Sequence, residues 1–186
     1  MIRIAIIIGS TRPGRVAPLV ADWVRKIAAD RVDASFDIVD LADHPLPHFD
    51  EPTPPIFDRY EQPHTQAWAA TVAAYDGYIF VTPEYNHSTT GVLKNSIDYL
   101  YAEWNDKVAG FVSYGVDGGS RATEHLRLIA GELKLADVRS QVTLTLGRDI
   151  TDGQVRPSGR QPDKLRMMLD ELVAWGGALR TLRATS

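Results

Sequence analysis

Residues 2–29 read IRIAIIIGSTRPGRVAPLVADWVRKIAA, and this stretch indicates the fold class. It begins with an isoleucine-rich run at residues 2–8, which is typical of a strand that is buried on both faces. Apolar side chains then recur every three or four residues over 16–29, which predicts an amphipathic helix. A short loop that contains Gly9 and Gly14 joins the two. The stretch therefore predicts the first strand–loop–helix unit of a parallel sheet.

The same alternation of strand and helix continues along the chain. Four more strands are expected at residues 36–41, 77–81, 108–114 and 141–146. Four more helices are expected at residues 65–75, 91–101, 120–135 and 162–182. Strands that alternate with helices form parallel sheets covered on both faces, and their crossovers are right-handed. We therefore expect an α/β fold with a doubly wound, five-stranded parallel sheet.

The composition limits the classes of function. A chain of 186 residues has the length of one ordinary domain. It is 44% hydrophobic and 24% charged, as globular proteins are, and its net charge of −4 argues against nucleic acid or anionic lipid as a partner. The chain has no cysteine, which excludes disulfides, thiolate metal sites and cysteine nucleophiles. No apolar run approaches the roughly 20 residues of a membrane span and no secretion signal is evident, so we expect a cytoplasmic protein.

Ligands of such sheets bind beyond the carboxyl ends of the strands, near the point where the strand order reverses. The loops after the first, third and fourth strands are therefore the candidates. In the first, residues 9–15, Ser10, Arg12 and Arg15 stand at a helix start, where backbone amides and the helix dipole favour an anion. The loop lacks both the P-loop lysine and the G-x-G-x-x-G pattern of dinucleotide sites. We expect one terminal phosphate here; the alternative is a capped helix with two solvated arginines.

The loop after the third strand, residues 82–91, is predicted to hold a flat ring. Pro83 stiffens its entry, and an ordered loop would present several backbone groups and Tyr85 to an aromatic heterocycle. The alternatives are that Glu84 pairs with a nearby arginine and that Tyr85 lies in the core. His87 is more typical of a surface residue than of an acid or a base.

The loop after the fourth strand, residues 113–120, contains three glycines. Glycines allow the main chain to approach a ligand closely, or they simply make a tight turn.

Two further segments interrupt the alternation. Residues 44–63 carry six prolines and cannot form a regular helix, and residues 147–161 are polar and contain glycine. Long loops of this kind serve either as lids or as rigid surface excursions, and both interpretations stay open.

Taken together, the loops after the first, third and fourth strands resemble those of the NADPH-dependent FMN reductase family, a flavodoxin-like group that includes chromate, azo-dye and quinone reductases. The resemblance rests on residues 9–12 (GSTR), 83–88 (PEYNHS), 93–100 (LKNSIDYL) and 114–119 (YGVDGG). It covers about residues 1–180. It implies a flavodoxin-like fold with strand order 2-1-3-4-5 and a single FMN-binding domain over residues 1–186.

The resemblance also implies which residues bind FMN. The phosphate ligands would be Ser10, Arg12 and Arg15. The isoalloxazine-binding turn would be formed, mainly through its main chain, by Pro83, Glu84, Tyr85 and Asn86. The loop on the pyrimidine side of the ring would be formed by Ser113, Tyr114, Gly115, Gly118 and Gly119. Many members have a serine and an asparagine where this chain has Arg15, Val16 and Ala17, so part of the phosphate contact would pass from hydroxyl to guanidinium.

The family's dimer suggests the oligomeric state. The helix after the third-strand loop resembles one that packs in that dimer. We expect Tyr99, Tyr101 and Trp104 to give this helix and its end an aromatic surface. The implied state is a homodimer or a homotetramer.

The implied activity is that of an FMN-dependent NAD(P)H oxidoreductase. NADPH or NADH would pass a hydride from its C4 to flavin N5 and leave before a second acceptor binds, which predicts ping-pong kinetics. Free flavin, quinone, azo compound and metal oxyanion all remain open as acceptors. We expect no metal and assign no catalytic side chain. The alternatives are a flavodoxin-type electron carrier, a ligand-sensing domain without activity, and a hydrolase, which is disfavoured because no nucleophile elbow surrounds Ser88.

Overall fold

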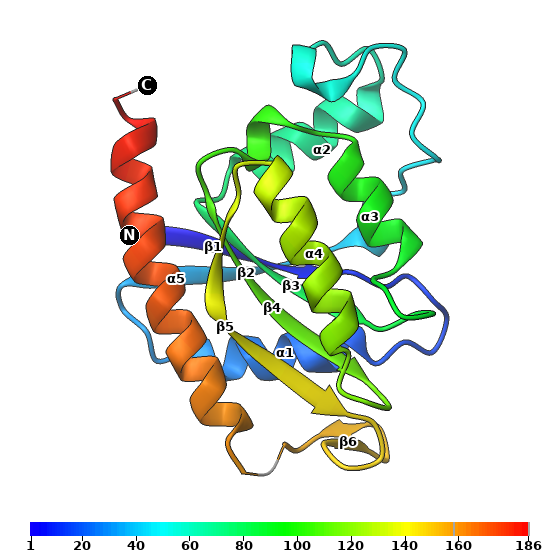
Figure 1. Ribbon diagram of the computed structural model, residues 1–186, viewed down its shortest axis with the longest axis vertical. Coiled ribbons are helices and arrows are strands. Elements are labelled where there is room, and N and C mark those ends of the chain that lie inside the picture. Colours follow the sequence, from blue (N-terminus) through cyan, green and yellow to red (C-terminus); the bar gives the residue numbers. More distant parts are fainter. Residues whose placement is uncertain (158, 186) are drawn as a thin grey trace.

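The computed structural model describes residues 1–157 and 159–185, which contain one large sheet of five parallel strands. The strands lie in the order β2-β1-β3-β4-β5 (Figure 1). They are β1 (Ile2–Ile8), β2 (Ala34–Asp40), β3 (Gly77–Pro83), β4 (Val108–Gly115) and β5 (Ala136–Thr145). The predicted doubly wound sheet and its strand order are confirmed, and the order reverses between β1 and β3.

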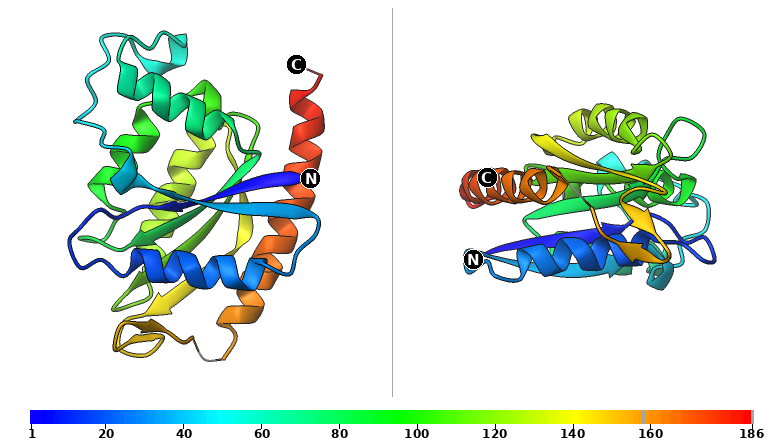
Figure 2. Two further views of the ribbon diagram at one scale, coloured as in Figure 1. Left: turned by 180° about the vertical axis from the view of Figure 1, so that it is seen from behind. Right: turned by 90° about the horizontal axis from the view of Figure 1, so that it is seen from below.

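Helices cover both faces of this sheet (Figure 2). On one face lie α1 (Ala17–Ala28) and α5 (Gln161–Arg183); on the other lie α2 (Pro63–Ala73), α3 (Gly91–Asp98) and α4 (Ser120–Glu132). The period of two in β1 serves both layers, because Ile4 and Ile6 pack toward α1 and α5 while Ile7 packs toward α2 and α3. Each fully buried isoleucine contributes roughly 1.5–3 kcal/mol to folding. No helix in the described ranges is long and apolar enough to cross a bilayer.

Most predicted elements agree with the structure to within a few residues, but β5 begins earlier than expected. It starts at Ala136 and not at residue 141. The register to β4 shifts between Ala109 and Phe111, and the first half of β5 exposes polar side chains such as Arg139. An edge strand that faces water in this way lacks the apolar run that marks a buried strand, so the sequence pattern missed it.

The prediction of an aromatic surface on α3 and at its end is wrong. Tyr99 and Trp104 are both 0% exposed, and only Tyr101 is partly accessible. The Trp104 ring packs edge to face on Tyr78 with their centroids 4.8 Å apart, and its indole N–H donates to the Ile97 carbonyl at 3.1 Å. Because α3 ends at Asp98, the chain that follows turns inward and buries these rings in the core.

The proline-rich segment 44–63 is a fixed part of the surface. The buried carboxylate of Glu51 accepts the backbone N–H groups of Glu61 and Gln62 at 2.8 and 3.0 Å, which closes the segment on itself. The Asn95 side chain of α3 bonds to the segment's main chain on both sides of residue 48, at 2.7 and 3.0 Å. These contacts favour the rigid excursion over the lid.

The second long segment, residues 147–161, contains a short hairpin. Its strands are β6 (Ile150–Thr151) and β7 (Gln154–Val155), which pair antiparallel. Ser158 lies outside the described residues.

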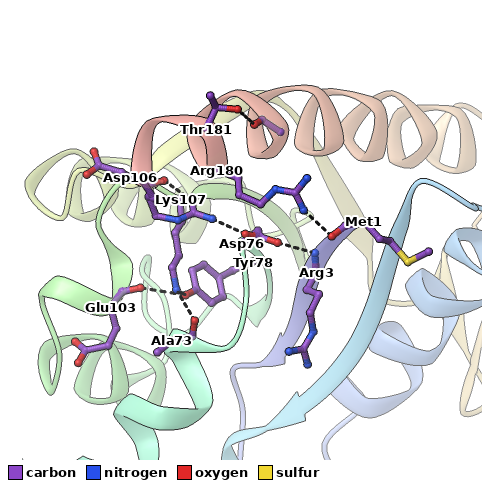
Figure 3. A network of polar contacts seen from close by, with 12 residues as sticks. Met1, Arg3, Ala73, Asp76, Tyr78, Glu103, Asp106, Lys107, Arg180 and Thr181 are labelled. Atoms are coloured by element: carbon purple, nitrogen blue, oxygen red, sulfur yellow. Dashed lines mark hydrogen bonds and ion pairs between the residues drawn. The ribbon is translucent and has the colours of Figure 1, made fainter. Parts of the chain in front are cut away.

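At the edge of the sheet where β3 and β4 begin, polar contacts gather around Lys107 (Figure 3). Its ammonium group donates to the carbonyls of Val72 and Ala73, which end α2, at 3.1 and 3.3 Å, and to the Tyr78 hydroxyl at 3.0 Å. Burial, and after it the nearby positive charge of Arg183, lower the pKa of Lys107 to about 8. This network joins α2 to the sheet at the end opposite the candidate loops.

Candidate functional site

Three loops meet at the carboxyl edge of the sheet. Because β1 lies between β2 and β3, the loop after β1 adjoins the loop after β3, and the loop after β4 lies on the far side of that one. The Ser10 Oγ atom lies 3.4 Å from the Tyr85 hydroxyl oxygen, and the Glu84 N–H donates to the Tyr114 carbonyl at 3.0 Å. The structure thus brings the three groups of predicted site residues together.

The loop after β1 leads into a helix whose N-cap residue does not cap it. Val16 is the N-cap residue of α1, and its side chain makes no hydrogen bond to the first amides of the helix. Arg12 is exposed, and its guanidinium makes no ion pair or hydrogen bond with the described residues. A helix start whose N-cap side chain does not bind the first amides, beside the exposed cation of Arg12, is suited to a small anion.

Arg15 is placed differently from Arg12. Its two Nη atoms donate to the two carboxylate oxygens of Asp40, at 2.7 and 2.6 Å, and the two side chains are only 18% and 17% exposed. The donors expected to contact a phosphate are therefore already engaged. The sequence pattern did not point to Asp40, although this residue ends β2, pairs in register with Ile8 and so lies beside this loop.

The loop after β3 contains a tight turn. Tyr85 and Ser88 exchange backbone hydrogen bonds of 2.9 and 3.1 Å, and Asn86 and His87 between them have φ values of 48° and 72°. Two positive φ angles in succession define a type I′ turn, which is rigid. The side chains of Tyr85, Asn86 and His87 are exposed, so Tyr85 is not a core residue and His87 lies at the surface. An ordered turn with an accessible aromatic ring is what the sequence predicts.

Glu84 pairs with an arginine from the neighbouring loop. Its carboxylate accepts the backbone N–H of Arg121 at 3.2 Å and the Arg121 Nε–H at 2.6 Å, while the same guanidinium reaches Asp117 at 3.0 Å. The Glu84 side chain is only 10% exposed. Its carboxylate therefore fixes the turn to the first turn of α4. The sequence pattern did not point to Arg121, although only Ser120 separates it from the glycine pair.

The loop after β4 is shaped by its glycines. Gly119 has φ +79°, and a Cβ atom there would lie 2.9 Å from the Ser113 Cβ and from the Tyr114 backbone nitrogen. No side chain fits this position, so glycine is required. The Ser113 hydroxyl donates to the Gly118 carbonyl at 2.9 Å and is buried, which means that Ser113 supports the loop from within. Gly115 is buried at the start of the same loop.

Tyr114 connects the third loop to the first. Its ring is 4% exposed. Burial raises the pKa of the Tyr114 hydroxyl far above its ordinary value, and the positive charges of Arg12 and Arg15 oppose that shift in part. Tyr114 is therefore a neutral hydroxyl at physiological pH. No cluster of three or more His, Asp or Glu side chains that could bind a metal ion occurs within residues 1–157 and 159–185.

Comparison with known proteins places these features in a family. The model of the NADPH-dependent FMN reductase family matches residues 2–149. An NAD(P)H-dependent FMN reductase of Schizosaccharomyces pombe is 42% identical over 159 residues, which cover 84% of this chain and 80% of that protein. A quinone reductase of Escherichia coli K12 is 35% identical over 135 residues, 69% of each chain.

A solved structure shows the same fold. The flavoenzyme NAD(P)H:(acceptor) oxidoreductase of Paracoccus denitrificans superposes with a TM-score of 0.71 at 20% sequence identity, and the match covers 96% of this chain and 98% of that one.

Proposed function

The chain belongs to the NADPH-dependent FMN reductase family, a family of oxidoreductases that use FMN and a reduced nicotinamide, and we propose that it transfers electrons to a second small acceptor in a ping-pong reaction. The observation that carries the proposal is the meeting of three loops at the β1–β3 switch point, tied by the Ser10–Tyr85 and Glu84–Tyr114 contacts. We also propose that residues 1–186 form one FMN-binding domain.

The residues at this edge fit both ends of FMN. The start of α1, which the Val16 side chain does not cap, and the exposed guanidinium of Arg12 suit a phosphate. The rigid turn at residues 85–88 and the loop at residues 113–119 lie side by side, joined by the Glu84–Tyr114 hydrogen bond, and the glycine at 119 lets the second loop pack closely on Ser113 and Tyr114. We therefore propose that Ser10 and Arg12 bind the phosphate, and that residues 83–86 and 113–119 bind the ring through their main chain.

The bound flavin supplies the redox chemistry, since its ring accepts a hydride from a reduced nicotinamide and gives electrons to an acceptor. The protein contributes binding and orientation. The Glu84–Arg121 ion pair keeps the turn and the start of α4 in one arrangement. Backbone N–H groups of the glycine loop are donors in fixed positions, and such donors stabilise negative charge without having to reorganise. Tyr114 remains protonated, because burial raises its pKa, and so adds no opposing negative charge.

Two substrates are to be identified by experiment, the electron acceptor and the nicotinamide. Quinone reductases stand among the relatives, so a quinone is the acceptor class that we propose to test first, ahead of free flavin, azo compounds and metal oxyanions. Both nicotinamides are candidates, because the fungal relative is named for NAD(P)H. A flavodoxin-type carrier is the second candidate function. It shares the fold, and it differs in having no direct reaction with a nicotinamide.

The absorption spectrum of freshly purified protein tests the proposal. The expected result is a flavin absorption band at about 450 nm that bleaches on anaerobic addition of NADPH or NADH and returns when a quinone is added. Steady-state rates measured at several quinone concentrations should give parallel double-reciprocal lines. A flavin that only a chemical reductant can bleach would identify an electron carrier. Protein that takes up no FMN would refute the proposal.

The family resemblance supports a homo-oligomer, and the expectations from the sequence support a cytoplasmic location. We propose a homodimer or homotetramer in the cytoplasm. Since Tyr99 and Trp104 are buried, the contact between subunits would have to use other side chains. Sedimentation of the holoprotein distinguishes monomer, dimer and tetramer.

A further inference from the structure

The Arg15–Asp40 pair connects three parts of the cofactor edge. Arg15 belongs to the loop after β1, and Asp40 is the last residue of β2. The Asp40 carboxylate accepts both Nη groups of Arg15 and also the backbone N–H of Ala42 at 2.9 Å, so its position is fixed from the β2 side. Parallel pairing places Asp40 opposite Ile8, one residue before the loop begins.

Arg15 also closes its own loop. Its Nη1 group donates to the Ser10 carbonyl, and its backbone N–H donates to the Arg12 carbonyl at 3.1 Å. The two bonds hold the residues on either side of Thr11 from the inside of the loop. With three side-chain contacts made and 18% of the side chain exposed, little of the guanidinium is left to meet a ligand.

The pair also changes the charge of the loop. Arg15 and Asp40 neutralise one another, whereas Arg12 is exposed and makes no such contact within the described residues. The loop therefore offers one uncompensated guanidinium, that of Arg12, and a set of backbone amides.

We propose that Arg15 is a positioning residue and not a phosphate ligand: with Asp40 it forms a clamp that holds the loop after β1 in the shape that binds phosphate. The inference rests on the proposed FMN site and deepens it. Arg12 is then the cation that contacts the phosphate. Asp40 is negatively charged like the phosphate, yet it favours phosphate binding because it holds the loop in shape through Arg15.

The role of Asp40 distinguishes a clamp from a ligand. If Arg15 binds phosphate directly, Asp40→Asn removes a competing negative charge and should leave FMN binding unchanged or tighter. If the pair is a clamp, Asp40→Asn releases the loop and weakens FMN binding. The two interpretations therefore predict opposite signs for one substitution.

The experiment compares FMN with riboflavin, which lacks the phosphate. Flavin fluorescence is titrated with cofactor-free wild type, Arg15→Gln, Asp40→Asn and the double variant. Arg25→Gln is the matched control, because Arg25 forms an exposed ion pair with Asp22 on α1. We expect each single change at the clamp to weaken FMN binding by about tenfold or more. The double variant should be no weaker than the singles, and riboflavin affinity should change by less than about threefold. The control should match wild type. FMN binding by Asp40→Asn that equals or exceeds wild type would overturn the proposal.

A second measurement does not depend on FMN. Hydrogen exchange of the peptide that covers residues 9–17 is followed in the same cofactor-free variants, with circular dichroism to establish that they are folded. Both clamp variants should exchange this peptide faster than wild type and the Arg25→Gln control. Unchanged exchange would overturn the clamp. If the wild type binds neither FMN nor riboflavin but the clamp variants still exchange the peptide faster than it does, the proposed function is refuted and the clamp stands. The two failures are therefore distinguishable.

Discussion

Replacing Gly119 by alanine should destabilise the loop after β4 through two separate effects. The first is conformational, since Gly119 has φ +79°, and an L-residue in this region costs roughly 1–2 kcal/mol. The second is steric, because the new Cβ would lie 2.9 Å from the Ser113 Cβ and the Tyr114 nitrogen. Overpacking of this kind typically costs roughly 1–3 kcal/mol. The free energy of unfolding should therefore fall by about 2–5 kcal/mol, which a domain of ordinary stability can survive.

Gly147→Ala is the matched control for this prediction. Gly147 has φ +82°, nearly the same as Gly119, but nothing lies within 4 Å of an added Cβ. It should therefore show only the conformational cost, about 1–2 kcal/mol. Denaturant unfolding of the cofactor-free variants measures both losses, and fluorescence titration measures FMN affinity, which should fall only for Gly119→Ala. Equal losses of stability in the two variants would refute the reasoning, because the contact with Ser113 and Tyr114 would then cost nothing.

Three further substitutions test other parts of the molecule. Arg12→Ala should weaken FMN binding by roughly tenfold to a hundredfold, because it removes a charged hydrogen bond to the phosphate, and should leave riboflavin binding alone; an unchanged FMN dissociation constant would dismiss the phosphate role. Arg121→Ala should remove the ion pair with Glu84, leave only the backbone N–H of residue 121 on its carboxylate, and speed hydrogen exchange of the turn at residues 83–88; exchange equal to wild type would show that the ion pair does not fix the turn. Lys107→Met tests the buried cation. The pKa of Lys107 is lowered from 10.5 to about 8, so the unfolded chain binds this proton more tightly and wild-type stability should rise with pH between these values. The variant should lack that rise, and denaturant unfolding at about pH 7.5 and pH 9.5 measures it. If the free energy of unfolding changes by the same amount between these pH values in both proteins, the lowered pKa of Lys107 is contradicted.

Much of the site can be predicted from the chain because the relevant signals are local. The isoleucine run at residues 2–8 and the helical spacing that follows are read from neighbours in sequence, and they determine which loops lie at the carboxyl edge of a parallel sheet. The glycines at 118 and 119 likewise indicate a loop whose main chain is closely approached. Residues 85–88 lie in an ordered turn, as the sequence predicts. The order and the positions of these loops accordingly follow from periodicity and handedness.

The partners of the charged side chains could not be read in this way. Arg15 meets Asp40 across 25 positions and Arg121 meets Glu84 across 37, and each pairing depends on strand register and on the direction in which a loop leaves its strand. The burial of Tyr99 and Trp104 depends in the same way on where α3 ends and how the chain then turns. Periodicity carries information over one or two turns of chain, whereas ion pairs and core contacts are made between segments that only the packed sheet brings together, and for that reason the residues could be nominated from the sequence while their roles required the fold.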